Sequence, residues 1–186
     1  MTYDQVRELY KSKGYPFMQA GPYQVNIYGI RNKDLITVDK FNDILGVAYL
    51  DRFGDKVNIQ IEGTTKPGLA YLGKIAGNLN GTGILIPGYY PNCWKVGIHN
   101  EGKPTAHLAM VQAADGVFKV WRDNDKDGQL DYTGKVYTDV RGLNGHRAGI
   151  NDTVNVGPYS AACQVAKEDK EHHIFMGVVE RSAELY

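Results

Sequence analysis

Residues 145–165 begin Gly145-His146-Arg147-Ala148-Gly149 and, after six further residues, continue Val156-Gly157-Pro158-Tyr159-Ser160-Ala161-Ala162-Cys163-Gln164-Val165. This segment holds one histidine and one cysteine, His146 and Cys163, separated by sixteen residues and each flanked by small residues. Cysteine is the side chain closest to a nucleophile at neutral pH, and a neighbouring imidazole can accept its proton. The spacing therefore predicts a cysteine–histidine pair.

The residues around Cys163 suggest how the thiol is activated. Those after it are mostly helix formers as far as Glu171, which predicts a helix that starts directly behind the cysteine. The positive end of a helix favours the thiolate. Because Ala161 and Ala162 are small, backbone amides there can approach a bound carbonyl and form an oxyanion hole.

The segment resembles the catalytic core of the L,D-transpeptidase family. In that family a histidine, usually followed by glycine, precedes Ser-x-Gly-Cys by a similar interval, and Arg or Asn follows closely. The resemblance covers about residues 80–166. It implies that Cys163 is the nucleophile, His146 the base and Ser160 the serine of the motif, with Gly157 and Ala162 as supporting residues.

The segment departs from the family pattern at three places. Arg147 replaces the glycine after the histidine, Ala162 replaces the glycine before the cysteine, and Gln164-Val165 supplies no arginine or asparagine. Arg147 is the guanidinium nearest to His146 in sequence and the candidate to replace the missing arginine. Without that arginine we expect hydrolysis rather than cross-linking. The alternative is a cysteine that only packs in the core.

The composition indicates one mainly β domain. A chain of 186 residues is long enough for one well-buried domain, here residues 1–186, and short for two. Apolar content of 42%, 22 glycines and 13 tyrosines favour a β-sandwich or partly closed barrel. We expect an N-terminal helix and a helix following the cysteine. The family resemblance implies the same architecture.

The charge balance limits the classes of partner. Lys+Arg and Asp+Glu both number 21, so no overall field attracts nucleic acid or an acidic membrane surface. Two cysteines, Cys93 and Cys163, do not make a disulfide framework, and a nucleophilic Cys163 has to be free. We expect a monomer whose partner is the stem peptide of peptidoglycan.

The N-terminus has no apolar signal core, and no run of eighteen apolar residues occurs. We therefore expect the protein to be made in the cytoplasm. It would reach the cell wall after lysis, in a phage particle or through a specialised export route. This expectation favours a phage-type lysin.

The remaining elements are predicted from periodicity and turn residues. A helix should open at Thr2 and end at Gly14. Strands are predicted over residues 23–30, 49–52, 57–62, 82–86, 93–99, 106–112, 117–121, 135–139 and within 174–185. Residues 117–121 should form a hairpin with 106–112. Residues 39–45 read as one helical turn or a loop, and residues 73–83 as turns rather than a nucleotide site.

The run from Asp123 to Asp131 matches the first nine positions of a calcium loop. Its candidate ligands are Asp123, Asp125, Asp127, Gln129 through its backbone carbonyl, and Asp131. The twelfth position is Gly134, so the bidentate glutamate of an EF-hand is missing. Structural calcium and a polar hairpin tip are both compatible with this run, and catalysis requires no cofactor in either case.

Several groups are candidates to orient His146: Asp139, Asn144, Asp152 or a backbone carbonyl. The leading function is a cysteine peptidase or transpeptidase that acts on peptidoglycan peptides through an acyl-enzyme.

One alternative stays open, a non-enzymatic phage or cell-surface module that uses the aromatics Tyr89, Tyr90, Trp94 and Trp121. A zinc peptidase built from His99, His107, His146 and carboxylates is the weakest alternative and is set aside, because the sequence has no HExxH or comparable short spacing.

Overall fold

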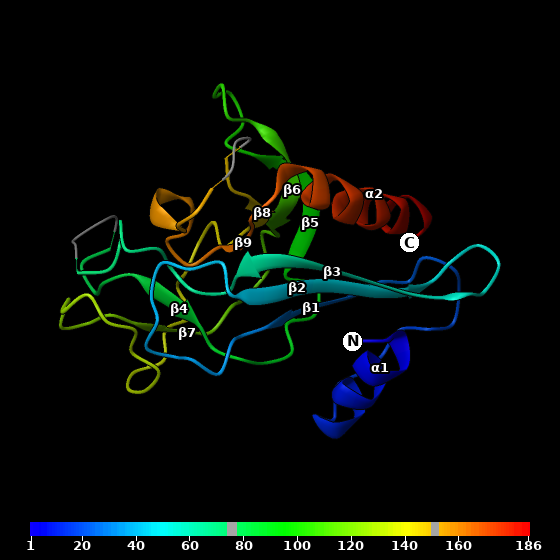
Figure 1. Ribbon diagram of the computed structural model, residues 1–186, viewed down its shortest axis with the longest axis horizontal. Coiled ribbons are helices and arrows are strands. Elements are labelled where there is room, and N and C mark those ends of the chain that lie inside the picture. Colours follow the sequence, from blue (N-terminus) through cyan, green and yellow to red (C-terminus); the bar gives the residue numbers. More distant parts are fainter. Residues whose placement is uncertain (74–77, 150–152) are drawn as a thin grey trace.

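The structure, a computed structural model, describes residues 1–73, 78–149 and 153–186. It is mainly β, with an N-terminal helix, a C-terminal helix and a mixed sheet, and it is not a closed barrel. The prediction of a mainly β fold with these two helices is confirmed (Figure 1).

The helices are α1 (Tyr3–Ser12) and α2 (Asp169–Leu185), with a short 3-10 helix η1 (Gly157–Tyr159). The strands are β1 (Asn26–Ile30), β2 (Asp43–Leu50), β3 (Lys56–Thr64), β4 (Gly83–Leu85), β5 (Trp94–His99), β6 (His107–Gln112), β7 (Val120–Arg122), β8 (Gly145–Arg147) and β9 (Gln164–Ala166).

Seven strands form one sheet in the order β1-β2-β3-β9-β8-β6-β5, and β4 pairs with β7 in a second, two-stranded sheet. All neighbours are antiparallel except β8 and β9, which run parallel. Parallel neighbours need a crossover connection, and the chain between Arg147 and Gln164 provides it. The two strands of the 145–165 segment thus lie at the middle of the large sheet.

The two helices cover opposite faces of the sheet. Leu45, Ile61 and Met110 pack against the apolar side of α2, and we call this side the α2 face. Tyr28 and Ala48 pack against α1 on the α1 face. Figure 1 shows α1 and α2 on opposite sides of the ribbon formed by β1, β2 and β3. Because side chains alternate along a strand, each residue of β8 and β9 can be assigned to one of these faces.

The N-terminal helix forms as predicted, and the strand predicted over residues 57–62 lies within β3, whereas β2 begins and ends earlier than the strand predicted over residues 49–52. Thr2 caps α1 in a capping box with Gln5, and the chain leaves the helix at Lys13 and Gly14. Strands β2 and β3 pair along their whole length around the turn at Phe53-Gly54.

Residues 39–45, predicted as a helical turn or a loop, instead contain the start of β2. Asp43 already pairs with Gly63 of β3. The Asp43 carboxylate accepts hydrogen bonds from Thr65 at 2.7 Å and lies 3.6 Å from the buried Lys66 ammonium. These partners stabilise an extended backbone that the polar sequence does not indicate.

Two predictions around β7 are wrong. Strand β7 pairs with β4 rather than with β6, so residues 106–121 do not form a hairpin. Residues 135–139 form no strand, and only Tyr137 makes an isolated bridge, to Val120. The side chain of Gln112 bonds the carbonyl oxygen of Gly116 and turns the chain away from β6. The pairing of β4 with β7 joins residues that are distant in sequence, so no local sequence pattern predicts it.

The C-terminal prediction is also wrong in part. Residues 174–185 belong to helix α2 rather than to a strand, and the residues directly behind Cys163 form strand β9 rather than a helix. His172, Phe175, Met176 and Val179 are the buried residues of α2. Their spacing of three, one and three residues is that of one helix face. Because one of these positions holds a polar histidine, the sequence does not show the apolar period of a helix there.

Candidate functional site

The parallel pairing of β8 and β9 brings Cys163 and His146 to one face of the sheet. Gly145 pairs with Gln164 and His146 with Val165, and Asn144 O accepts the N–H of Gln164 at 2.9 Å. Cys163 therefore lies beside Asn144, two residues from His146 along the register. Alternation places both side chains on the α1 face, about 7 Å apart along the strands.

The Cys163 sulfur has two hydrogen-bond partners. The backbone N–H of Asn144 donates to Sγ at 3.4 Å, and the thiol donates to the carbonyl oxygen of Gly142 at 3.4 Å. Burial raises the pKa of the Cys163 thiol, while the N–H groups of Asn144 and Cys163 oppose the rise. Since β9 separates the cysteine from α2, no helix dipole acts directly on the thiol. At rest the sulfur is a protonated thiol.

His146 is buried, with 4% of its surface exposed. Its Nδ1 lies 2.7 Å from the carbonyl oxygen of Arg147. A carbonyl oxygen only accepts, so Nδ1 carries the proton and Nε2 carries the lone pair. Nε2 is buried and has no hydrogen-bond partner within the described ranges. Burial, and then His99, lowers the pKa of His146 to about 3, so the ring is neutral at pH 7.

His99 is the ring neighbour of His146, and the sequence grouped the two only in the zinc alternative. The two rings stack with centroids 3.8 Å apart and planes 8° apart. His107 pairs with His99 across β5 and β6. The centroid of its ring lies 5.9 Å from that of His146 and 5.8 Å from that of His172 in α2. Burial lowers the pKa of His99 and of His172 to about 4. The pairing of His99 with His107 could have been predicted from a hairpin of residues 93–99 and 106–112. No local sequence pattern predicts that either histidine lies beside His146.

Asn144 connects the cysteine with strands β5 and β6. Its Oδ1 accepts the N–H of Gln112 at 2.9 Å, and its Nδ2 lies 3.0 Å from Nδ1 of His99. Its backbone N–H bonds the sulfur of Cys163. Asn144 therefore fixes the position of the sulfur and of His99, whereas the carbonyl of Arg147 fixes the tautomer of His146.

The remaining orienting candidates lie elsewhere. Asp139 is exposed and pairs with Arg122 at 3.4 Å. Asp152 lies outside the described residues.

Ser160 and Ala162 lie directly before the cysteine. Ser160 is fully buried, and its hydroxyl donates to the carbonyl oxygen of Cys163 at 2.8 Å. Neither Ala162 nor Cys163 donates its backbone N–H to another residue in the described part of the chain. Two backbone donors beside the sulfur are what an oxyanion hole needs.

Gly157 and Arg147 act through other contacts. The N–H of Gly157 donates to Asp39 at 2.6 Å, and a Cβ on Gly68 would lie 2.1 Å from the Gly157 oxygen, so this turn is tightly packed. Arg147 pairs with Asp169 of α2 at 2.8 Å. Alternation places its side chain on the α2 face, opposite Cys163.

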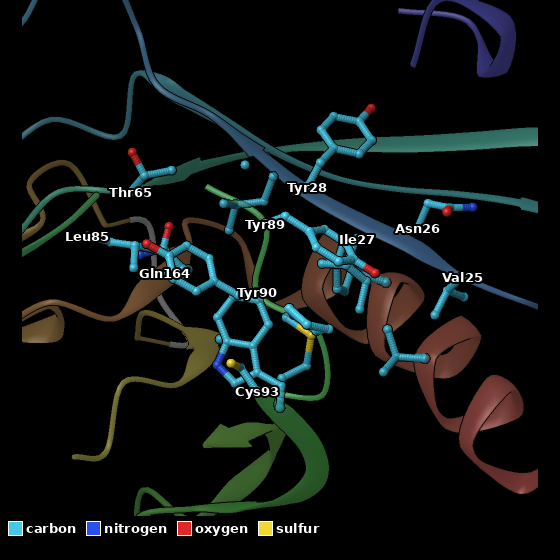
Figure 2. Close-up of a pocket in the computed structure, with 18 of the residues that line it drawn as sticks. Val25, Asn26, Ile27, Tyr28, Thr65, Leu85, Tyr89, Tyr90, Cys93 and Gln164 are labelled. Atoms are coloured by element: carbon cyan, nitrogen blue, oxygen red, sulfur yellow. The ribbon is translucent and has the colours of Figure 1, made fainter. Parts of the chain in front are cut away.

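A cavity of about 910 Å³ lies mainly along the α2 face and extends toward α1. Figure 2 shows Tyr90 and Cys93 on one side of it and Val25 and Asn26 on the other. The cavity reaches Gly145, His146 and Gln164, but Cys163 is not among the described residues that line it. This cavity is therefore not the space in front of the thiol.

The four aromatics considered for ligand binding differ in exposure. Tyr89 is 42% exposed and stacks on Tyr15 at 5.6 Å. Tyr90 and Trp94 pack against Phe118 in the core, and Trp121 is half-buried beside Tyr132. Of the four, Tyr89 is the one classed as exposed, and Tyr15 covers part of its ring.

The acidic loop gathers three of its predicted ligands. Asp123, Asp125 and Asp131 each have a carboxylate oxygen within 4.8 Å of those of the other two. Burial, and then Asp125, raises the pKa of Asp131. Asp127 instead bonds the backbone and side chain of Gln129.

The chain matches no protein-family model, no curated protein and no solved structure. Among the described residues, no helix is both long and apolar enough to span a membrane.

Proposed function

We propose that this protein is a cysteine enzyme that acts on the peptide part of peptidoglycan, with Cys163 as nucleophile and His146 as general base. The substrate class follows from the resemblance of residues 145–165 to the L,D-transpeptidase core. One observation carries the chemistry: Cys163 and the unpartnered Nε2 of His146 lie on the same face of two adjacent parallel strands.

The reaction starts when the sulfur of Cys163 attacks an amide carbonyl of the stem peptide. Nε2 of His146 accepts the thiol proton, and the backbone N–H groups of Ala162 and Cys163 donate to the oxyanion. The C–N bond then breaks as His146 returns the proton to the leaving amine. Water attacks the thioester, releases the acid and restores the thiol.

In the free protein Cys163 and His146 are both neutral, and this determines the step at which the thiol proton is transferred. A raised thiol pKa and a His146 pKa of about 3 make a thiolate–imidazolium pair unfavourable in the free protein. Proton transfer therefore accompanies the attack on the carbonyl instead of preceding it.

Hydrolysis is favoured over cross-linking. Arg147 is held by Asp169, and no arginine or asparagine follows Cys163 closely. The side chain that would bind the carboxylate of an acceptor strand in a transpeptidase is thus missing from this position.

The test uses purified peptidoglycan with the wild-type protein, Cys163→Ala and Cys93→Ala. Released fragments are identified by mass. Cys93 is the matched control because it is the second free cysteine and bonds Val117 in a different core cluster. We expect new fragments from the wild type and from Cys93→Ala and none from Cys163→Ala. Equal digestion by Cys163→Ala would refute the proposal.

A second candidate is a binding module on the same fold without enzymatic activity. The raised pKa of Cys163 and the lowered pKa of His146 favour it, because an inert buried pair has the same properties. Binding of peptidoglycan without any released fragment, by both the wild type and Cys163→Ala, supports this candidate.

A further inference from the structure

Asp123 of the acidic loop has a buried carboxylate with too few hydrogen-bond partners among the described residues. Asp123 is 1% exposed. Its Oδ2 accepts the N–H of Gly73 at 2.8 Å, but Oδ1 is buried and has no hydrogen-bond partner among the described residues. Burying an ionised oxygen without a partner is costly, and folded proteins normally satisfy such atoms.

Two further carboxylates converge on Asp123. Oxygens of Asp125 and Asp131 lie within 4.8 Å of one from Asp123, and no described lysine or arginine forms an ion pair with any of the three. Three like charges at this separation repel one another. A bound cation removes the repulsion and satisfies the buried oxygen at once.

The donor atoms select the kind of cation. The three side chains offer carboxylate oxygens only, with neither imidazole nor thiolate, so the site suits a hard ion rather than zinc or copper. Calcium accepts irregular sets of six to eight oxygens, whereas magnesium requires a near-ideal octahedron. Three carboxylates on a loop, completed by water, fit calcium better.

We propose that Asp123, Asp125 and Asp131 form a calcium site. It does not depend on the proposed enzymatic function. With an incomplete ligand set, we expect a dissociation constant on the order of 0.1–1 mM, as in extracellular calcium modules.

The site is connected to the segment that carries Cys163. The N–H of Asp123 donates to the carbonyl oxygen of Thr82 at 3.1 Å. The hydroxyl of Thr82 donates to the carbonyl oxygen of Ala161 at 3.0 Å. A cation that fixes Asp123 thereby stabilises β4, β7 and the chain just before the cysteine.

Calcium binding is tested on the full chain after treatment with a chelator. The melting temperature is followed while calcium chloride is added to 10 mM, with magnesium chloride in parallel. At 10 mM, calcium is in roughly ten- to hundredfold excess over the expected dissociation constant, which should raise the melting temperature by roughly 3–10 °C, and magnesium should have a smaller effect. An unchanged melting temperature at 10 mM calcium would overturn the proposal.

Matched variants locate the site. Asp125→Asn and Asp131→Asn should weaken calcium binding at least tenfold, whereas Asp127→Asn, in the same loop but outside the cluster, should bind like the wild type. Terbium luminescence gives a second readout because Trp121 and Tyr132 flank the loop and can sensitise the ion. Calcium should displace the terbium signal. Equal affinity in all three variants would contradict this assignment.

Discussion

Cys163 has a sulfur that is fixed by a backbone N–H but not ionised by its surroundings. The pKa of its thiol is raised because the side chain is buried, and only the thiolate reacts quickly with alkylating agents. We therefore expect iodoacetamide to modify Cys163 slowly at pH 7, with the rate rising only above roughly pH 8.5, the ordinary thiol value.

This reaction is measured by mass spectrometry in the Cys93→Ala background, so that one thiol remains. A rate that reaches half its maximum below pH 7 would show a thiolate already stabilised in the free protein. Such a result would contradict the neutral resting pair.

At the residue scale the spacing of His146 and Cys163 in the sequence led to the hypothesis of a functional pair, which stays a prediction. The structure places His146 in β8 and Cys163 directly before β9, the strand that pairs with β8. The stacking of His99 on His146 depends on the register of β5, β6 and β8, which no local pattern encodes. Likewise, the expected helix dipole at the cysteine is absent because a strand intervenes.

The turn before the cysteine depends on one glycine outside it. Gly68 donates its N–H to the carbonyl oxygen of Ser160 at 2.8 Å, and a Cβ at this position would meet the Gly157 oxygen at 2.1 Å. Gly68→Ala should displace η1 and the residues behind it. We expect a loss of about 1–3 kcal/mol in the free energy of unfolding, measured with urea, and weaker peptidoglycan digestion.

Gly177→Ala is the matched control for this substitution. Gly177 lies on the exposed side of α2, and a methyl group there would have no atom within 4 Å, so alanine should stabilise the protein by about 0.5–1 kcal/mol. If Gly68→Ala were as stable as Gly177→Ala, the close packing of the turn would be wrong.

At the element scale, the ends of a helix could be predicted from nearby residues, but the pairing of distant strands could not. The capping box of Thr2 and Gln5 and the glycine after α1 allowed that helix to be predicted from sequence. In α2 the polar His172 occupies a core position, so the helical period was missed. The partner of β7 is β4, more than thirty residues away, and only the fold reveals it.

The buried histidines make the stability of the whole molecule depend on pH. His146 and His172 are both 4% exposed, and burial lowers their pKa values to about 3 and about 4, against about 6.5 in the unfolded chain. Between pH 6.5 and 4 the unfolded chain therefore binds protons that the folded chain does not. Stability falls as the pH falls through this window.

Each of these histidines should contribute a slope of at most about 1.4 kcal/mol per pH unit. We expect the free energy of unfolding in urea to fall by roughly 1–3 kcal/mol between pH 6.5 and pH 5, where most carboxylates stay ionised. His172→Gln should reduce the slope. A free energy of unfolding that does not change over this interval would contradict the burial of neutral histidines.

At the scale of the molecule, composition predicted a mainly β domain, and the sheet places the 145–165 segment at its centre. The equal numbers of acidic and basic residues gave no indication of the local cluster of Asp123, Asp125 and Asp131. That cluster was visible only as a sequence motif. The folded chain brings together Asp123, Asp125 and Asp131, whereas Asp127, also predicted as a ligand, is not in this cluster.

The central claim, that Cys163 forms a covalent bond with the substrate, is tested most directly by intact-protein mass spectrometry. The wild-type protein is mixed with a synthetic peptidoglycan stem peptide and quenched in acid within seconds. We predict a mass increase equal to the acyl part of the peptide, located on the fragment that contains Cys163 and much smaller in His146→Gln. Peptide turnover by Cys163→Ala, or an adduct on Cys93 alone, would contradict the account.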